Sequence, residues 1–112
     1  MNPLTQMNQA MDYIEEHLMD EISFERIAQI SGCSEYHFRR MFSYLAGMPL
    51  GEYIRCRRLA LAGTLLRDGH KVIDCAMLLG YASPDAFRKA FQGLHGISPS
   101  DLHRKRNVLM PY

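Results

Sequence analysis

The chain has 112 residues, 47% of them hydrophobic, which is typical of one globular domain or of two small subdomains that share a helix. Thirteen Lys and Arg residues nearly balance twelve Asp and Glu residues, so the net charge of +1 does not by itself indicate a nucleic-acid partner. No apolar run approaches the roughly 20 residues of a membrane span, no signal peptide opens the sequence, and three cysteines without a C-x-x-C pattern argue against disulfides and thiolate metal sites. We therefore expect a cytoplasmic protein without membrane contact, cofactor or metal.

The charges are segregated along the sequence. Residues 1–38 hold seven acidic residues and one basic residue, for a net charge of −6, whereas residues 39–112 hold twelve basic and five acidic residues, for a net charge of +7. A dipolar domain of this kind can present its basic side to phosphates and its acidic side to water or to another protein. The acidic residues at positions 12–21 are equally consistent with simple solvation of the first helix.

The first two predicted elements are helices. Ser23 is a good N-cap for the second one, which ends at Ser31 and Gly32, where glycine can adopt a left-handed turn. The first helix covers about 15 residues, and its apolar side chains recur at helical spacing: Leu4, Met7, Met11, Ile14 and Leu18.

A third helix is predicted at 34–46 and a fourth at 49–68, separated by Gly47 and Pro49. The fourth helix is apolar nearly all round, which is typical of a helix buried on more than one side. Its length of roughly 30 Å is close to one turn of B-DNA, about 34 Å, so we expect it to space two reading helices about one turn apart. The predicted inward face of the third helix consists of Phe38, Met41, Phe42 and Leu45.

The remaining helices are predicted at 71–79, at 83–95 and after Ser98. Ser83 and Pro84 begin the middle one as N-cap and first helical residue. Its expected inward face consists of Phe87, Ala90, Phe91 and Leu94. No strand pattern of useful length occurs, so the predicted fold is all-α, with seven helices. The expected organisation is a helix-turn-helix subdomain at 1–48, a linker helix at 49–69, a second helix-turn-helix subdomain at 70–106, and a tail or start of a linker at 107–112.

Residues 27–55 and 75–104 form an internal repeat. Ala28 and Gly32 recur 48 residues later, whereas Ser34, Phe38 and Phe42 recur 49 residues later, so the second turn has one extra residue. Each copy reads as a short helix, a glycine turn, and a second helix with paired basic residues on its outer face. This is the layout of a helix-turn-helix DNA reader.

Removing the buried positions from the two reading helices leaves the residues that can meet DNA. Taken alone, each basic pair would fit an ordinary solvated helix face, but the recurrence after a core phenylalanine favours DNA. An arginine can make a bidentate contact to guanine worth about 1–3 kcal/mol of discrimination. The predicted base contacts are Tyr36, Arg39, Arg40, Asp85, Arg88 and Lys89. The predicted backbone contacts are Ser34, Ser43, Arg55, Ser83 and Gln92.

The acidic residues near the helix starts have two interpretations. Glu35 and Asp85 can each accept a hydrogen bond from cytosine, or they can simply favour the positive end of the helix dipole. Tyr36 can contact a thymine methyl group or a phosphate.

Several motifs carry a family resemblance that covers about residues 5–105. They include Ile27-Ala28-x-x-x-Gly32, Tyr36-His37-Phe38-x-Arg40-x-Phe42, Arg57-Arg58-Leu59, Ala76-x-x-x-Gly80-Tyr81 and Gly96-x-Ser98-Pro99. Together they resemble the DNA-binding domain of AraC/XylS-type bacterial transcription regulators. The resemblance implies a seven-helix fold, regulation from promoters, two recognition helices in adjacent major grooves, and the six base-contact positions named above. It also implies RNA polymerase as a partner of an activator. Two organisations are consistent with it: the N-terminal part of a longer regulator, with a C-terminal effector domain absent from this chain, or a short stand-alone member. Lys89 stands where the family usually has arginine.

No enzymatic chemistry is predicted. The five histidines lack metal-ligand spacing, and no P-loop, nucleophile elbow or G-x-G-x-x-G occurs. The alternative to a DNA-binding regulator is an all-helical protein-interaction module that uses the acidic first helix and an exposed Tyr44.

Overall fold

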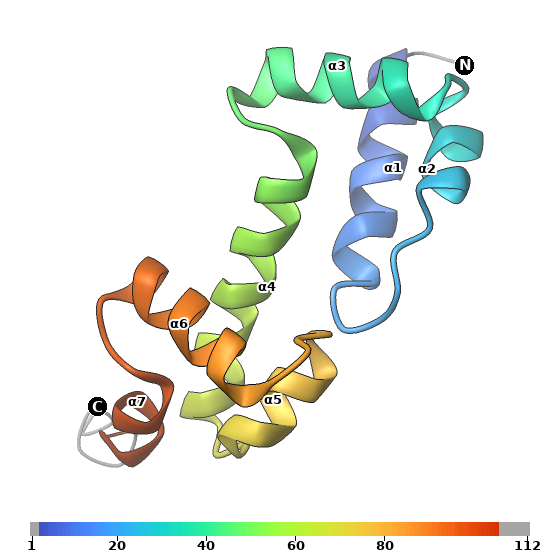
Figure 1. Ribbon diagram of the computed structural model, residues 1–112. Coiled ribbons are helices and arrows are strands. Elements are labelled where there is room, and N and C mark those ends of the chain that lie inside the picture. Colours follow the sequence, from blue (N-terminus) through green and yellow to red (C-terminus); the bar gives the residue numbers. More distant parts are fainter. Residues whose placement is uncertain (1–2, 106–112) are drawn as a thin grey trace. The chain divides into compact units, whose positions relative to one another are not determined.

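The computed structural model describes residues 3–105, and these residues form seven helices and no strand (Figure 1). The helices are α1 (Pro3–Glu16), α2 (Phe24–Ser31), α3 (Glu35–Ala46), α4 (Leu50–Arg67), α5 (Val72–Leu78), α6 (Pro84–His95) and α7 (Pro99–Lys105). The predicted all-α class and the order of the helices are confirmed. The predicted tail at 107–112 lies outside the described residues.

The chain divides into two compact units, and the boundary falls inside α4 between Arg55 and Cys56. In the first unit α1 packs on α2 and α2 packs on α3 (Figure 1). The edge of the Tyr53 ring meets Phe42 with 5.2 Å between centroids, which fixes the start of α4 against α3. The buried core consists of Met7, Ala10, Ile14, Leu18, Ile22, Ile27, Phe38, Phe42, Leu50 and Ile54.

The second unit is built from the rest of α4 and the last three helices. Helix α5 packs on α6 and α7, and α6 packs on α7. Phe87 lies at the centre, with its ring centroid 5.4 Å from that of Tyr81 and 5.7 Å from that of Phe91. The buried cluster consists of Leu59, Ala62, Leu66, Cys75, Ala76, Leu79, Phe87, Phe91 and Leu102.

The serines predicted as N-caps of α2, α3 and α6 are confirmed. The hydroxyl oxygens of Ser23, Ser34 and Ser83 each accept a hydrogen bond, at 3.1 Å, from the backbone N–H three residues later. These caps satisfy a donor that the helix itself cannot pair. Gly32 ends α2 with φ 75°, a left-handed conformation that costs glycine little and other residues more. The local signals therefore fix the helix boundaries within one or two residues of their predicted positions.

Two leucines predicted to face the core are instead exposed. Leu45 is 67% exposed and Leu94 46%, so their predicted burial is wrong. Leu4, the first member of the apolar stripe of α1, is 65% exposed. Helix α2 has eight residues against fourteen in α1, so it does not cover the first turn of α1, where Leu4 lies. Leu45 and Leu94 sit in the last turns of α3 and α6, three residues after the second buried phenylalanine of each helix.

The predicted linker helix at 49–69 corresponds to α4, which begins at Leu50 and ends at Arg67. Leu50 and Ile54 are buried in the first unit, whereas Leu59, Ala62 and Leu66 are buried in the second. The helix thus contributes to both cores, as its lack of a polar face predicted. The spacing of the two reading helices along DNA stays a prediction. Across residues 3–105, no helix combines the length and the apolar character that crossing a bilayer requires.

Candidate DNA interface

Helix α3 separates its core residues from its outward residues cleanly. Phe38 and Phe42 are buried one turn apart, and Tyr36, Arg40 and Tyr44 are exposed along one line of the opposite side. Residues spaced by four share a helix face, so these three side chains present one continuous strip. The strip borders a shallow hollow lined by Tyr36, His37, Arg40, Met41 and Tyr44.

Tyr36 and Arg40 contact each other within this strip. A guanidinium nitrogen of Arg40 donates to the Tyr36 hydroxyl at 3.4 Å, and the guanidinium carbon lies 5.9 Å from the centre of the tyrosine ring. Within residues 3–105 no carboxylate pairs with Arg40, and a hydroxyl acceptor does not neutralise its positive charge. Arg40 therefore keeps both its charge and most of its donors for an anion or a base edge.

Arg39 is held more firmly than its neighbour. Its Nε donates to Glu35 Oε2 at 3.0 Å, and its guanidinium lies over the Phe24 ring, 4.1 Å from the ring centre. The first contact is within α3, and the second joins α3 to the first residue of α2. Of the two basic residues in the pair, Arg39 is anchored and Arg40 is the more available.

Helix α6 repeats the arrangement with different chemistry. Phe87 and Phe91 are buried, and Arg88, Lys89 and Gln92 are exposed. Arg88 donates to the carboxylate of Asp85 in an i, i+3 pair. Within the part of the chain that the structure describes, Lys89 forms no ion pair. Lys89 and Arg40 therefore occupy equivalent positions of the repeat, and both are available to contact DNA.

The predicted backbone-contact residues lie at the ends and flanks of these helices. Ser34 and Ser83 are exposed N-caps, Gln92 is exposed and Ser43 is half-buried. Arg55 is exposed on α4, and one of its nitrogens lies 4.0 Å from a Glu52 oxygen. Helix starts with free N–H groups are favourable places for phosphates. The structure thus leaves the predicted contacts accessible, with Ser43 the least so.

Residues 27–105 match the helix-turn-helix domain family. AarP of Providencia stuartii, a transcriptional activator, is 40% identical over 95 residues, which cover 84% of this chain and 70% of AarP. The regulatory protein SoxS of Salmonella typhimurium is 36% identical over 96 residues, covering 85% of this chain and 90% of SoxS. The chain belongs to the AraC/XylS-type family of helix-turn-helix DNA-binding domains.

Solved structures agree with this assignment. An AraC-type regulator from Chromobacterium violaceum has the same fold, with a TM-score of 0.84 over 97% of this chain and 96% of that one, at 21% identity. The DNA-binding domain of AdpA, solved with a target DNA, has a TM-score of 0.80 over 94% of this chain and 96% of that one, at 25% identity. Relatives differ in length: the chain spans 32% of YbfP of Bacillus subtilis, to which it is 37% identical over 94 residues covering 83% of this chain.

One contact that positions α6 in this AraC/XylS-type domain has no signal in the sequence. The Nε2 atom of His95 lies 2.9 Å from the Leu59 carbonyl oxygen, and its ring lies 4.2 Å from that of Phe91. These contacts tie the end of α6 to α4 across 36 residues of sequence. The Glu35–Arg39 and Asp85–Arg88 pairs were also missed, although their i, i+4 and i, i+3 spacing is a visible signal.

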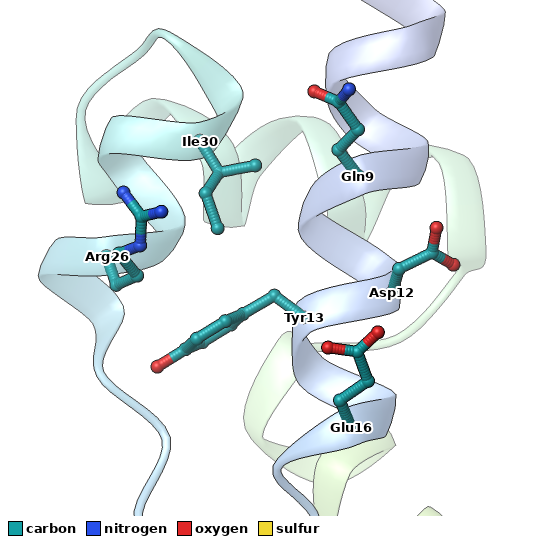
Figure 2. A pocket seen from close by; sticks show the side chains of 6 residues that line it. All are labelled: Gln9, Asp12, Tyr13, Glu16, Arg26 and Ile30. Carbon is teal, nitrogen blue, oxygen red and sulfur yellow. The ribbon is translucent and has the colours of Figure 1, made fainter.

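The acidic first helix of the domain forms one wall of a second concave surface, an open cleft of about 370 Å³ (Figure 2). Figure 2 shows Tyr13 projecting from α1 toward the start of α2, where its hydroxyl accepts a hydrogen bond from Ser23 N at 3.1 Å. Arg26, across the cleft, donates to Gln29 at 3.2 Å. Asp12 and Glu16 lie on the wall formed by α1. Among the described residues, no group of His, Cys, Asp and Glu could hold a metal ion.

Proposed function

We propose that this chain is the sequence-specific DNA-binding domain of a transcription regulator, which inserts α3 and α6 into successive major grooves. The observation that carries the proposal is the repeated pair of outward basic residues, Arg39-Arg40 and Arg88-Lys89, each backed by two buried phenylalanines. Family membership supports it. So do the relatives AarP, a transcriptional activator, and SoxS, a regulatory protein, and the AdpA domain, which was solved with its target DNA. The proposal includes a cytoplasmic location, which is where a bacterial transcription regulator meets its DNA.

In this proposal the two helices hold DNA alike but read different bases. Arg40 is positioned to fork onto a guanine, and Tyr36 supports it or contacts a thymine methyl group. Lys89, at the equivalent position, is a point donor and gives looser discrimination than a guanidinium fork. Arg39 and Arg88 stand beside these readers, partly occupied by their acidic partners. A single chain therefore recognises an asymmetric site.

The caps and flanking residues supply binding that is independent of sequence. Ser34 and Ser83 cap their helix starts, where the positive end of the helix dipole is favourable for phosphates. Ser43, Gln92 and Arg55 add polar or positive groups near them. Such contacts fix the register of the protein on the duplex, while the base contacts decide which duplex is preferred.

Salt dependence tests the proposal. The protein is titrated against a pool of randomised duplexes, the bound duplexes are sequenced, and the dissociation constant of a selected duplex is measured between 50 and 200 mM salt. With several phosphates neutralised, the affinity falls by a factor on the order of 100 or more across this range. Binding that ignored salt, or a bound pool without any enriched sequence, would contradict sequence-specific DNA binding.

We also propose a contact with RNA polymerase, and the internal repeat favours α5 as the surface. Ile73 is 52% exposed and Met77 is 72% exposed on this helix. The equivalent positions of α2, which are 48 residues earlier, hold Glu25 and Gln29. The first unit folds with polar residues at these two positions, so the fold does not require apolar side chains there. This observation favours α5 over the acidic α1 as the protein-binding face.

The test is a gel shift in which RNA polymerase is added to the complex of regulator and selected duplex. The double variant Ile73→Glu, Met77→Gln is expected to bind DNA normally and to retain less polymerase. The matched control Glu25→Ala, Gln29→Ala changes the corresponding face of α2 and is expected to retain polymerase as the unmodified protein does. Full retention by the α5 variant would contradict this surface.

A further inference from the structure

Each recognition helix carries an arginine that is paired with an acidic residue in the first turn. Arg39 and Arg88 are 49 residues apart and occupy the same position in the repeat. Their partners do not: Glu35 precedes its arginine by four residues and Asp85 precedes its arginine by three. The pairing recurs although the position of the acid has shifted by one residue, so the repeat alone does not account for it.

The pairing has a cost for DNA binding. All four side chains are between about 40% and 75% exposed, and each carboxylate lies in the first turn of a helix that is proposed to enter a major groove. A carboxylate there repels phosphates and competes with DNA for its arginine. An exposed ion pair contributes only about 0–1 kcal/mol to stability, so stability alone is a weak reason to have one in both helices.

We propose that Glu35 and Asp85 are specificity-determining residues that act through Arg39 and Arg88. Each carboxylate holds its arginine within the helix surface and away from phosphates, which weakens binding to arbitrary duplexes. A correctly placed guanine offers two acceptors to the arginine's remaining donors, while the carboxylate keeps hold of one nitrogen and orients the side chain. The inference rests on the proposed function, because it concerns how the same two helices discriminate between duplexes.

The two pairs differ in how firmly they hold the arginine. The Arg39 guanidinium also lies over Phe24, whereas the equivalent of Phe24 in the second unit is Val72, which has no ring. Removal of the Glu35 charge leaves Arg39 with its aromatic contact, while removal of the Asp85 charge releases Arg88. The variant Asp85→Asn therefore has the larger effect of the two.

The experiment compares dissociation constants for the selected duplex and for a scrambled duplex of equal length, at 100 mM salt. We expect Glu35→Gln to tighten binding to the scrambled duplex by about threefold, and Asp85→Asn by about fivefold, the factors that correspond to roughly 0.6 and 1 kcal/mol. Binding to the selected duplex tightens by a smaller factor, because the guanine contact loses the carboxylate that orients its arginine, so discrimination falls. The variant Asp85→Glu keeps the negative charge and is expected to discriminate between the selected and scrambled duplexes as the unmodified protein does.

The control variants are Glu16→Gln and Asp12→Asn, which make the same charge changes on α1. If they reduce discrimination as much, the effect is one of net charge and the inference is overturned. If Glu35→Gln and Asp85→Asn lower only the melting temperature, the acids serve the helix dipole, which also overturns it. A change confined to one preferred base would identify Asp85 as a direct cytosine acceptor instead. In each of these outcomes the unmodified protein still selects a sequence; failure of that selection overturns the proposed function itself.

Discussion

Phe87 and Leu94 lie on the same helix, and the structure assigns them unequal contributions to stability. Phe87 is wholly buried, with its ring edge-on to Tyr81 and packed against Phe91. Truncation of a buried phenylalanine to alanine costs about 3–5 kcal/mol, and the aromatic neighbours favour the upper end of that range. Leu94 is 46% exposed, so Leu94→Ala loses about half of a leucine's burial, on the order of 1 kcal/mol, and part of that is offset by the higher helix propensity of alanine.

The assay is thermal unfolding followed by circular dichroism at 222 nm, with urea titration as the equilibrium check. For a domain of this size each kcal/mol shifts the melting temperature by about 4–8 °C. Phe87→Ala is therefore expected to lower it by about 15 °C or more, and Leu94→Ala by less than about 6 °C. Similar shifts for the two variants, or a larger one for Leu94→Ala, would refute the assignment of Leu94 to the surface.

Two further predictions concern single positions in the second unit. Gly96→Ala is expected to lower the free energy of unfolding by about 1 kcal/mol, because Gly96 has φ 73°, whereas Gly93→Ala, inside α6, is expected to raise it by up to about 1 kcal/mol. An added Cβ meets nothing within 4 Å at either site, so urea titration of the two variants measures the backbone effect alone. Equal effects of the two substitutions would contradict this reasoning. Burial raises the pKa of the Cys75 thiol, and the adjacent Asp74 carboxylate raises it further. Iodoacetamide at pH 8 is therefore expected to modify the half-buried Cys33 and Cys56 well before Cys75, which mass spectrometry of the digested protein measures. Early modification of Cys75 would contradict its burial.

Local chemistry made the helix boundaries predictable. Ser34 and Ser83 each accept from the N–H three residues later, and Gly32 ends α2 in a left-handed conformation, as the sequence indicated. The phenylalanines of both recognition helices were predictable as core because they recur with the period of a helix and with the period of the repeat. These features depend on neighbours within a few residues, which a sequence displays directly.

Other features depend on which segments meet in space. Helical periodicity marked Leu45 and Leu94 as inward, but it does not reveal that these two positions in the last turns of α3 and α6 are left exposed. The contact of Arg39 with Phe24 requires α2 and α3 to be placed in three dimensions, and the contact of His95 with the Leu59 carbonyl oxygen requires the same of α4 and α6. Charge type alone also grouped Arg39 with Arg40, although the structure leaves Arg40 the more available.

In the proposed function, two helices of one chain read different parts of one DNA site. The most direct test repeats the selection from randomised duplexes with Arg40→Ala and with Lys89→Ala, and compares the bases that lose preference. We expect two separate blocks of bases, centred about one helical turn or 10 base pairs apart, with the larger loss for Arg40→Ala because a guanidinium fork discriminates better than an ammonium group. Loss of preference at the same bases in both variants would contradict the two-reader account.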